Sequence, residues 1–193
     1  MEHQVTLPEI LQARERRACL QKKLLAKYRT PLISFTMNIA GPIKNSPQIQ
    51  QGFQLGCRYL KEQLDSLNIP CVHYEEIHAP TGEEAFYLLD ADPLFIKEIT
   101  CSIEDGFELG RLFDMDVLKK SGEKVDRTEL GLLPRPCLIC GGPAKECARS
   151  RSHTVEALQA KTAQILARAI EDEDAVCSAR LACRALLYEV CTT

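Results

Sequence analysis

The segment LGRLFDMDVL, residues 109–118, holds two acids inside a short apolar run. If it is a strand, Asp114 and Asp116 share one face, roughly 7 Å apart at the backbone, because side chains alternate. Neighbouring carboxylates oppose each other's ionisation unless a cation neutralises them, and Mg²⁺ is often held by carboxylates together with substrate phosphates. The pattern therefore predicts a Mg²⁺ site, with a solvated Asp-x-Asp edge strand as the competing interpretation. The expected core-facing residues are Phe113, Met115 and Val117.

Two basic side chains are placed to meet phosphate. Arg111 comes just before the acids, where its guanidinium could pair with phosphate through two parallel hydrogen bonds. Lys44 lies in a Gly-Pro loop between an expected strand and an expected helix start, where free amides and the helix dipole favour an anion. The loop is neither a Walker loop nor a dinucleotide fingerprint, so an ordinary turn is the alternative.

Glu104 is a candidate third metal ligand. Residues 99–104 alternate apolar and polar side chains, which predicts a half-buried strand. Residues 105–109 are then expected to turn that strand back onto the acidic strand as a hairpin. Glu104 would lie near the acids, although a solvent-exposed glutamate at a strand end is an equal alternative.

A cluster of cysteines follows the loop that carries Arg135. The pattern C-x2-C-x6-C-x5-H supplies three thiols and one imidazole, which is the ligand set of tetrahedral zinc. Reduced buried thiols and a redox pair are the alternatives. Arg149 and Arg151 lie in the same loop and are candidates for phosphate contact. The candidate zinc ligands are Cys137, Cys140, Cys147 and His153.

Helices and strands are expected to alternate around these residues. Helix caps, the spacing of apolar residues and Gly/Pro breaks predict where each helix and strand lies. The first helix also carries six basic residues, which form either a solvated face or a docking surface for an acidic partner. From residue 152 the chain is expected to be helical, as one bent helix or two, with separate apolar stripes over 155–169 and 176–190. The other elements expected are helices over 6–29 and 46–67 and strands over 32–39, 71–77, 84–90 and 123–127.

Composition narrows the class of protein. The chain has 193 residues and a formal net charge of −3, so broad electrostatic binding to nucleic acid is not expected. No apolar run reaches membrane-spanning length, and the charged N-terminus does not resemble a secretory signal. We therefore expect a cytoplasmic protein whose ten cysteines are reduced thiols or metal ligands. The length predicts a single domain over 1–193, with a core at about 5–155 and a helical segment at about 152–190.

Three segments carry a resemblance to a known family. They are PLISFTMNIAGPIKNS at 31–46, GRLFDMDVL at 110–118 and PRPCLICGGPAKECARSRSH at 134–153. In order and spacing they resemble the citrate lyase holo-acyl-carrier-protein synthases, also called apo-citrate lyase phosphoribosyl-dephospho-CoA transferases.

The resemblance implies a fold and a reaction. The fold would be α+β, a nucleotidyltransferase-like mixed sheet flanked by helices, with a Cys-rich loop and a C-terminal helical segment. The enzyme would transfer the 5-phosphoribosyl-dephospho-CoA unit from triphosphoribosyl-dephospho-CoA to a serine of the apo acyl-carrier subunit of citrate lyase, releasing pyrophosphate. Asp114 and Asp116 would bind the metal beside Arg111, and one of the acids would help to deprotonate the serine. The candidates for binding the triphosphate, by charge and placement, are Lys44, Arg111, Arg127 and Arg135.

Three other functions compete with this one. The same chemistry could serve a different carrier, such as that of malonate decarboxylase. The Cys cluster could instead be the functional site of a non-catalytic zinc-binding adaptor for lyase assembly. A polynucleotide nucleotidyltransferase is disfavoured by the acidic net charge and the lack of a basic stripe.

Overall fold

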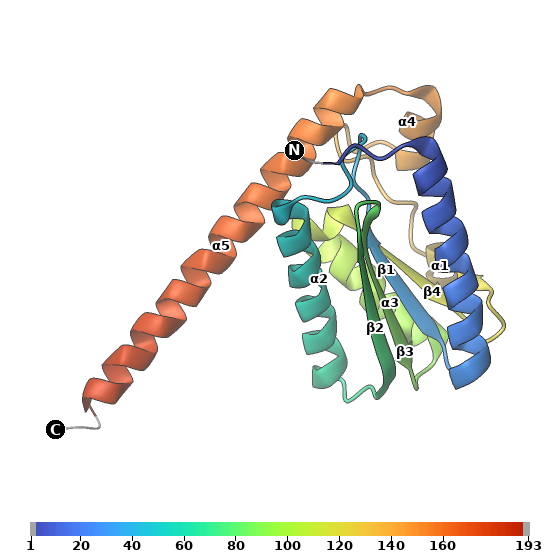
Figure 1. The fold of residues 1–193 in the computed structure, drawn as a ribbon. Coiled ribbons are helices and arrows are strands. Elements are labelled where there is room, and N and C mark those ends of the chain that lie inside the picture. The colour runs from blue at the N-terminus through green and yellow to red at the C-terminus, as the bar shows by residue number, and fades with distance from the viewer. Residues whose placement is uncertain (1–2, 191–193) are drawn as a thin grey trace.

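Five strands form one antiparallel sheet in the order β2-β3-β1-β4-β5 (Figure 1). The structure is a computed structural model that describes residues 3–190, with side chains described up to residue 173. The strands are β1 (Leu32–Met37), β2 (Cys71–Ala79), β3 (Gly82–Leu89), β4 (Phe113–Leu118) and β5 (Lys124–Val125). The helices are α1 (Leu7–Tyr28), α2 (Pro47–Ser66), α3 (Pro93–Gly106), α4 (Ala144–Ser150) and α5 (Val155–Val190), with 3-10 turns η1 (Leu109–Leu112) and η2 (Arg127–Leu130). The predicted α+β class is confirmed.

The sheet separates two apolar clusters. Helices α2, α3 and α5 cover one face, where Phe35 stacks on Phe53 and meets Phe113 edge-on. Helix α1 lies on the other face of the sheet (Figure 1). Its Leu24 and Leu25 pack with Leu32, Phe86 and Leu88 of the sheet. Because side chains alternate along a strand, Ile33 and Phe35 of β1 face α2 and α3, while Leu32 faces α1.

Both predicted helix starts are confirmed. Thr6 caps α1 with a capping box, in which Glu9 Oε2 accepts a hydrogen bond from the Thr6 amide at 2.7 Å. Ser46 caps α2 and accepts a hydrogen bond from the Ile49 amide at 3.3 Å. These caps satisfy amides that have no partner within the helix, so the chain enters each helix at a fixed residue.

The strand predicted over 99–104 is wrong, because this segment belongs to helix α3. Asp92 caps the helix by accepting from the Leu94 and Phe95 amides, and Pro93 occupies the first turn. The predicted hairpin at 105–109 is also wrong, since η1 links α3 to β4 and the strand begins only at Phe113. The last short strand is Lys124–Val125, and Arg127 opens η2 instead of ending a strand.

Strand β5 pairs only with Val117 and Leu118, so it leaves most of the outer edge of β4 without a neighbouring strand. Side chains from other elements cover that edge. The Met115 amide donates to Glu104 Oε1 at 2.8 Å, and the Met115 carbonyl accepts from Lys97 Nζ at 3.1 Å. The Phe113 carbonyl accepts from Arg135 Nη1 at 2.7 Å. Backbone groups that a longer β5 would have paired are thus satisfied by α3 and by the loop after η2.

Helix α5 packs against α2 and η1 through Ile165 and Leu166. It is one helix over its described length, and the side chains of the stripe predicted over 176–190 lie outside the described residues. No helix within residues 3–190 is long and apolar enough to cross a membrane.

Candidate active site and metal-binding cluster

Asp114 and Asp116 lie on the α1 face of the sheet. Phe113, Met115 and Val117 are fully buried on the opposite face, as the alternation predicts. Asp114 is in register with Thr36 of β1, and Asp116 with Ser34. Since α1 packs over β1 and β3, Asp114 remains open to solvent beside that helix. Pairing with β1 along its whole length therefore holds both carboxylates on one side of β4.

The two acids influence each other electrostatically. Partial desolvation by the surrounding chain and the neighbouring charge of Asp116 raise the pKa of the Asp114 carboxyl, although the side chain keeps contact with solvent. Lys124 of β5 reaches across, with Nζ 2.5 Å from Asp116 Oδ1. Burial opposes protonation of Lys124, but the hydrogen bond to Asp116 outweighs it and raises the pKa of the ammonium. The pair thus already attracts one cation, as expected of a metal site.

Sequence reasoning missed Lys124. The signal that could have found it is the Ser121-Gly122 pair, because a tight hairpin there pairs Leu118 with Lys124. That register places Lys124 on the same face as Asp116, one pleat away.

The neighbouring strands add polar groups to the same face. Glu84 of β3 is buried and lies 3.2 Å from Arg17 and 3.7 Å from Arg16 of α1. Gln21 of the same helix donates to Ser34 Oγ at 3.0 Å. Of the basic residues of α1, Arg16 and Arg17 therefore contact the sheet through Glu84, and the predicted solvated face applies only to the others.

Glu104 reaches β4 from α3, not from a paired strand. Its carboxylate accepts from the Met115 amide and lies 3.8 Å from Arg135 Nη1. Burial raises the pKa of the Glu104 carboxyl, and the positive charge of Arg135, which favours the ionised form, only partly offsets this effect. The side chain supports the strand that carries the acids, and its role as a third metal ligand stays a prediction.

Arg111 and Arg135 lie together at the start of β4. Arg135 donates to the backbone carbonyls of Phe113 and Arg111 at 2.7 and 3.1 Å, while Arg111 Nη2 donates to the Pro136 carbonyl at 2.5 Å. Burial and the charge of Arg135 lower the pKa of Arg111. Both guanidiniums line one cavity of about 750 Å³ between η1, the Cys-rich loop and the first turns of α5.

The other two predicted phosphate ligands lie elsewhere. Lys44 Nζ donates to the Ile39 carbonyl, and burial, followed by the charge of Arg14, lowers its pKa. Arg127 pairs with Asp105. Neither residue lines the cavity of Arg111 and Arg135, so the four predicted basic residues do not converge on one point.

The Cys-rich loop brings its four predicted ligands together. The three thiol sulfurs and one imidazole nitrogen lie within 4.8 Å of one another. Cys140 Sγ is 3.6 Å from Cys147 Sγ and 3.3 Å from His153 Nε2. Burial opposes ionisation of Cys137, but hydrogen bonds from the Cys140 and Ile139 amides lower the pKa of its thiol to about 7. Soft thiolates with one imidazole fit a tetrahedral metal, so this cluster could bind a metal ion.

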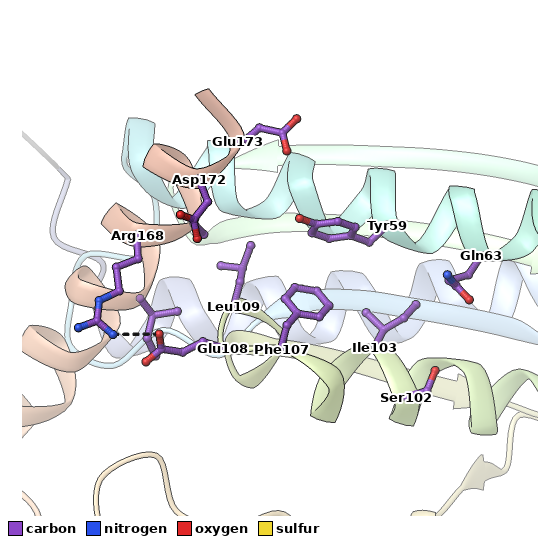
Figure 2. Close-up of a pocket in the computed structure, with 12 residues that line it drawn as sticks. Tyr59, Gln63, Ser102, Ile103, Phe107, Glu108, Leu109, Arg168, Asp172 and Glu173 are labelled. Carbon is purple, nitrogen blue, oxygen red and sulfur yellow. Dashed lines mark hydrogen bonds and ion pairs between the residues drawn. The ribbon is translucent and has the colours of Figure 1, made fainter. Parts of the chain in front are cut away.

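A separate cavity of about 560 Å³ lies between α2, α3 and α5 (Figure 2). Figure 2 shows Tyr59 and Phe107 at its wall and Arg168 paired with Glu108, at 3.3 Å. It opens on the face of the sheet opposite to Asp114 and Asp116. We therefore exclude it as the location of the acid-dependent chemistry.

Comparison with known proteins gives a consistent result. The family model described as apo-citrate lyase phosphoribosyl-dephospho-CoA transferase matches residues 5–169. A Streptococcus pyogenes serotype M18 protein named "Probable apo-citrate lyase phosphoribosyl-dephospho-CoA transferase" is 38% identical over 84% of this chain and 85% of its own length. The Citrobacter koseri protein named apo-citrate lyase phosphoribosyl-dephospho-CoA transferase is 33% identical over 81% of this chain and 85% of its own length.

A longer relative contains a region similar to this chain. "Protein CitXG" of Haemophilus influenzae is 35% identical over 79% of this chain, and the match spans 33% of that protein. The two relatives of similar length each align with more than 80% of this chain, and the family model matches residues 5–169. The family model therefore includes the motifs at 31–46, 110–118 and 134–153. The chain therefore belongs to the apo-citrate lyase phosphoribosyl-dephospho-CoA transferase family.

Proposed function

We propose that the chain transfers the 5-phosphoribosyl-dephospho-CoA unit from triphosphoribosyl-dephospho-CoA to a serine of the apo acyl-carrier subunit of citrate lyase. The observation that carries the proposal is the pairing of Asp114 and Asp116 on one face of β4, beside Lys124. Family membership names the transferred group, and the acids supply a place for the reaction.

The donor atoms fit Mg²⁺. Two carboxylates on adjacent same-face positions of a rigid strand, open to solvent at Asp114, match the usual protein share of a magnesium site. Bound Mg²⁺ would neutralise charge on the triphosphate during the displacement. Glu104 is the nearest further carboxylate on α3, and we keep it as the candidate third ligand.

The chemical step is a displacement at the α-phosphorus. The serine oxygen forms a bond to that phosphorus, the bond to the bridging oxygen of pyrophosphate breaks, and pyrophosphate leaves. The serine proton passes to a carboxylate of the pair. Of the four predicted phosphate ligands, Arg111 and Arg135 lie together at the start of β4. Lys44 and Arg127 lie apart from them and pair with the Ile39 carbonyl and with Asp105.

The Cys cluster is proposed to hold a structural Zn²⁺. Four protein ligands leave no open position, which is typical of structural and not catalytic zinc. The metal would fix the loop that delivers Arg135 to the edge of β4. We place the reaction in the cytoplasm, where such thiols stay reduced.

The test is mass spectrometry of the apo carrier incubated with the protein, the triphosphate precursor and Mg²⁺. We expect the carrier to gain the mass of one phosphoribosyl-dephospho-CoA unit. Asp114→Asn and Asp116→Asn should abolish the gain, while the exposed Asp65→Asn serves as the matched control. The apo carrier of malonate decarboxylase, offered in parallel, shows which carrier is preferred.

The adaptor alternative predicts the reverse pattern. A non-catalytic zinc adaptor would keep its function in lyase maturation after Asp114→Asn and lose it after Cys140→Ala. Transfer that survives Asp114→Asn and Asp116→Asn would therefore overturn the proposed function.

A further inference from the structure

The cavity shared by Arg111 and Arg135 has no role in the displacement itself. It lies between η1, the Cys-rich loop and the first turns of α5, with a volume of about 750 Å³. We propose that this cavity binds the adenosine diphosphate end of the dephospho-CoA moiety, while the triphosphate lies at Asp114 and Asp116. This inference rests on the proposed function and assigns a separate subsite for one part of the substrate.

The charge of the cavity suits a pyrophosphate diester. Arg111, Arg135 and Arg151 all line it, and no carboxylate side chain does so among the described residues. Arg151 has no ion pair within residues 3–173. Arg111 and Arg135 donate to backbone carbonyls and lie 3.7 and 3.8 Å from the carboxylates of Asp105 and Glu104. Guanidinium groups fixed side by side recognise phosphate oxygens in pairs, so two linked phosphates are the matching ligand.

The walls suit an aromatic base more than an inorganic anion. Leu112, Leu138 and Leu158 line the cavity together with Val155, which is 47% exposed although it faces other apolar groups. Pockets of this size and apolar character typically enclose nucleotide-sized ligands. A triphosphate alone would leave these apolar side chains uncovered.

The position of the cavity fits the connectivity of the substrate. Arg111 lies in η1, three residues before Asp114, and Arg135 donates to the Phe113 carbonyl, so the cavity borders the start of the strand that carries the acids. In the transferred unit, a single ribose links the dephospho-CoA part to the reacting phosphorus. A nucleotide in the cavity could therefore present the triphosphate to the acids without leaving its subsite.

The two loop arginines provide a matched pair of variants. Arg149 and Arg151 are both exposed, but only Arg151 lines the cavity. Isothermal titration with dephospho-CoA should show binding to the unaltered protein and to Arg149→Ala. The affinity of Arg151→Ala for dephospho-CoA should be lower by about ten-fold. Cys137, Cys147 and His153 also line the cavity, so metal content is measured in each variant. Leu158→Trp, which fills the cavity from α5, should abolish binding while metal content is unchanged and thermal unfolding stays cooperative.

Each outcome decides the inference. It is overturned if the protein does not bind dephospho-CoA, if Arg151→Ala and Leu158→Trp both bind it like the unaltered protein, or if inorganic triphosphate competes at the Arg151-dependent site. The transfer assay separates this failure from failure of the proposed function. If the protein modifies the carrier and Arg151→Ala does not weaken dephospho-CoA binding, the proposed function stands and the subsite is wrong. If dephospho-CoA binding depends on Arg151 but the carrier is never modified, the subsite stands and the proposed function is wrong.

Discussion

Lys124 Nζ lies 2.5 Å from Asp116 Oδ1, so a protein cation occupies the place where a metal ion is proposed to bind. The ammonium and the metal should therefore compete for the same carboxylate. Lys124→Met removes the competitor and leaves two unneutralised acids, so we expect divalent-cation affinity to rise several-fold. Titration with Mn²⁺, followed by electron paramagnetic resonance, measures this affinity. A weaker affinity would show that Lys124 helps to build the site.

Asp114 gives the free energy of unfolding a defined pH dependence. Its pKa is raised in the folded chain by burial and by Asp116, so the folded state holds more protons than the unfolded state just above the ordinary value of about 3.9. Below the ordinary pKa, Asp114 is protonated in both states and costs the folded state nothing. Above the raised pKa it is ionised in both states, and the folded state bears the full cost of the charge. The free energy of unfolding therefore falls as pH rises from the ordinary pKa to the raised one. Asp114→Asn should remove that slope and stabilise the protein at neutral pH by about 0.5–1 kcal/mol, allowing for solvent screening.

Urea unfolding between pH 3 and 7 checks this dependence. Asp65→Asn, at an exposed position of α2, should leave the slope unchanged. A steeper slope in Asp114→Asn would contradict the direction given for the Asp114 pKa.

Removal of the metal should weaken the whole edge of the sheet near β4. The Cys cluster folds the loop from which Arg135 reaches the Phe113 carbonyl. Cys140→Ser, or treatment with a zinc chelator, should lower Tm by roughly 5 °C because metal-binding energy contributes to folding. Metal analysis before and after treatment should show one zinc lost per chain. Cys19→Ser, at an exposed cysteine outside the cluster, is the control, and an equal Tm for all three proteins would refute a structural zinc.

Gly110 is required by close packing between η1 and α3. A Cβ at this position would lie 2.2 Å from the Ile103 carbonyl oxygen and 3.0 Å from that of Glu104. Because backbone atoms cannot move aside like a flexible side chain, Gly110→Ala should cost about 1–3 kcal/mol of stability. It should also reduce transfer, since η1 sets the position of Arg111 and the start of β4. Gly106→Ala is the matched control, because nothing lies within 4 Å of its Cβ, and an equal loss there would contradict this account.

Much of the fold could be predicted from local signals. The caps Thr6 and Ser46, the turn around Gly82 and the alternation through Phe113 and Val117 each specify geometry within a few residues. These signals fixed α1, α2, the β2–β3 hairpin and the shared face of the two acids.

Helix α3 shows where local reasoning failed. Ile99, Cys101 and Ile103 alternate, but over five residues a period of 2 and a period of 3.6 are easily confused. The helix buries Lys97 and Glu104 as well, because both serve the open edge of β4, and this hid the helical apolar pattern. Asp92-Pro93, a cap followed by a first-turn proline, was the signal that should have decided for a helix.

The candidate site was predicted only where its residues are neighbours in sequence. Asp114 and Asp116, and the Cys-rich loop, carry their geometry in their spacing. Lys124 comes from another strand, and Arg151 lines the same cavity as Arg111 only through folding of the Cys-rich loop, so their positions depend on tertiary contacts that spacing does not encode.

The two-residue length of β5 has a consequence for self-association. A bare sheet edge is a template on which strands of other molecules can add, and it promotes aggregation. Around Phe113 and Met115 that template is blocked by three side chains, one of which, Arg135, comes from the Cys-rich loop. Protection of the chain against edge-to-edge polymerisation thus depends on the loop that carries the candidate metal-binding thiols, and we expect oxidation of those thiols to expose the strand that carries Asp114 and Asp116.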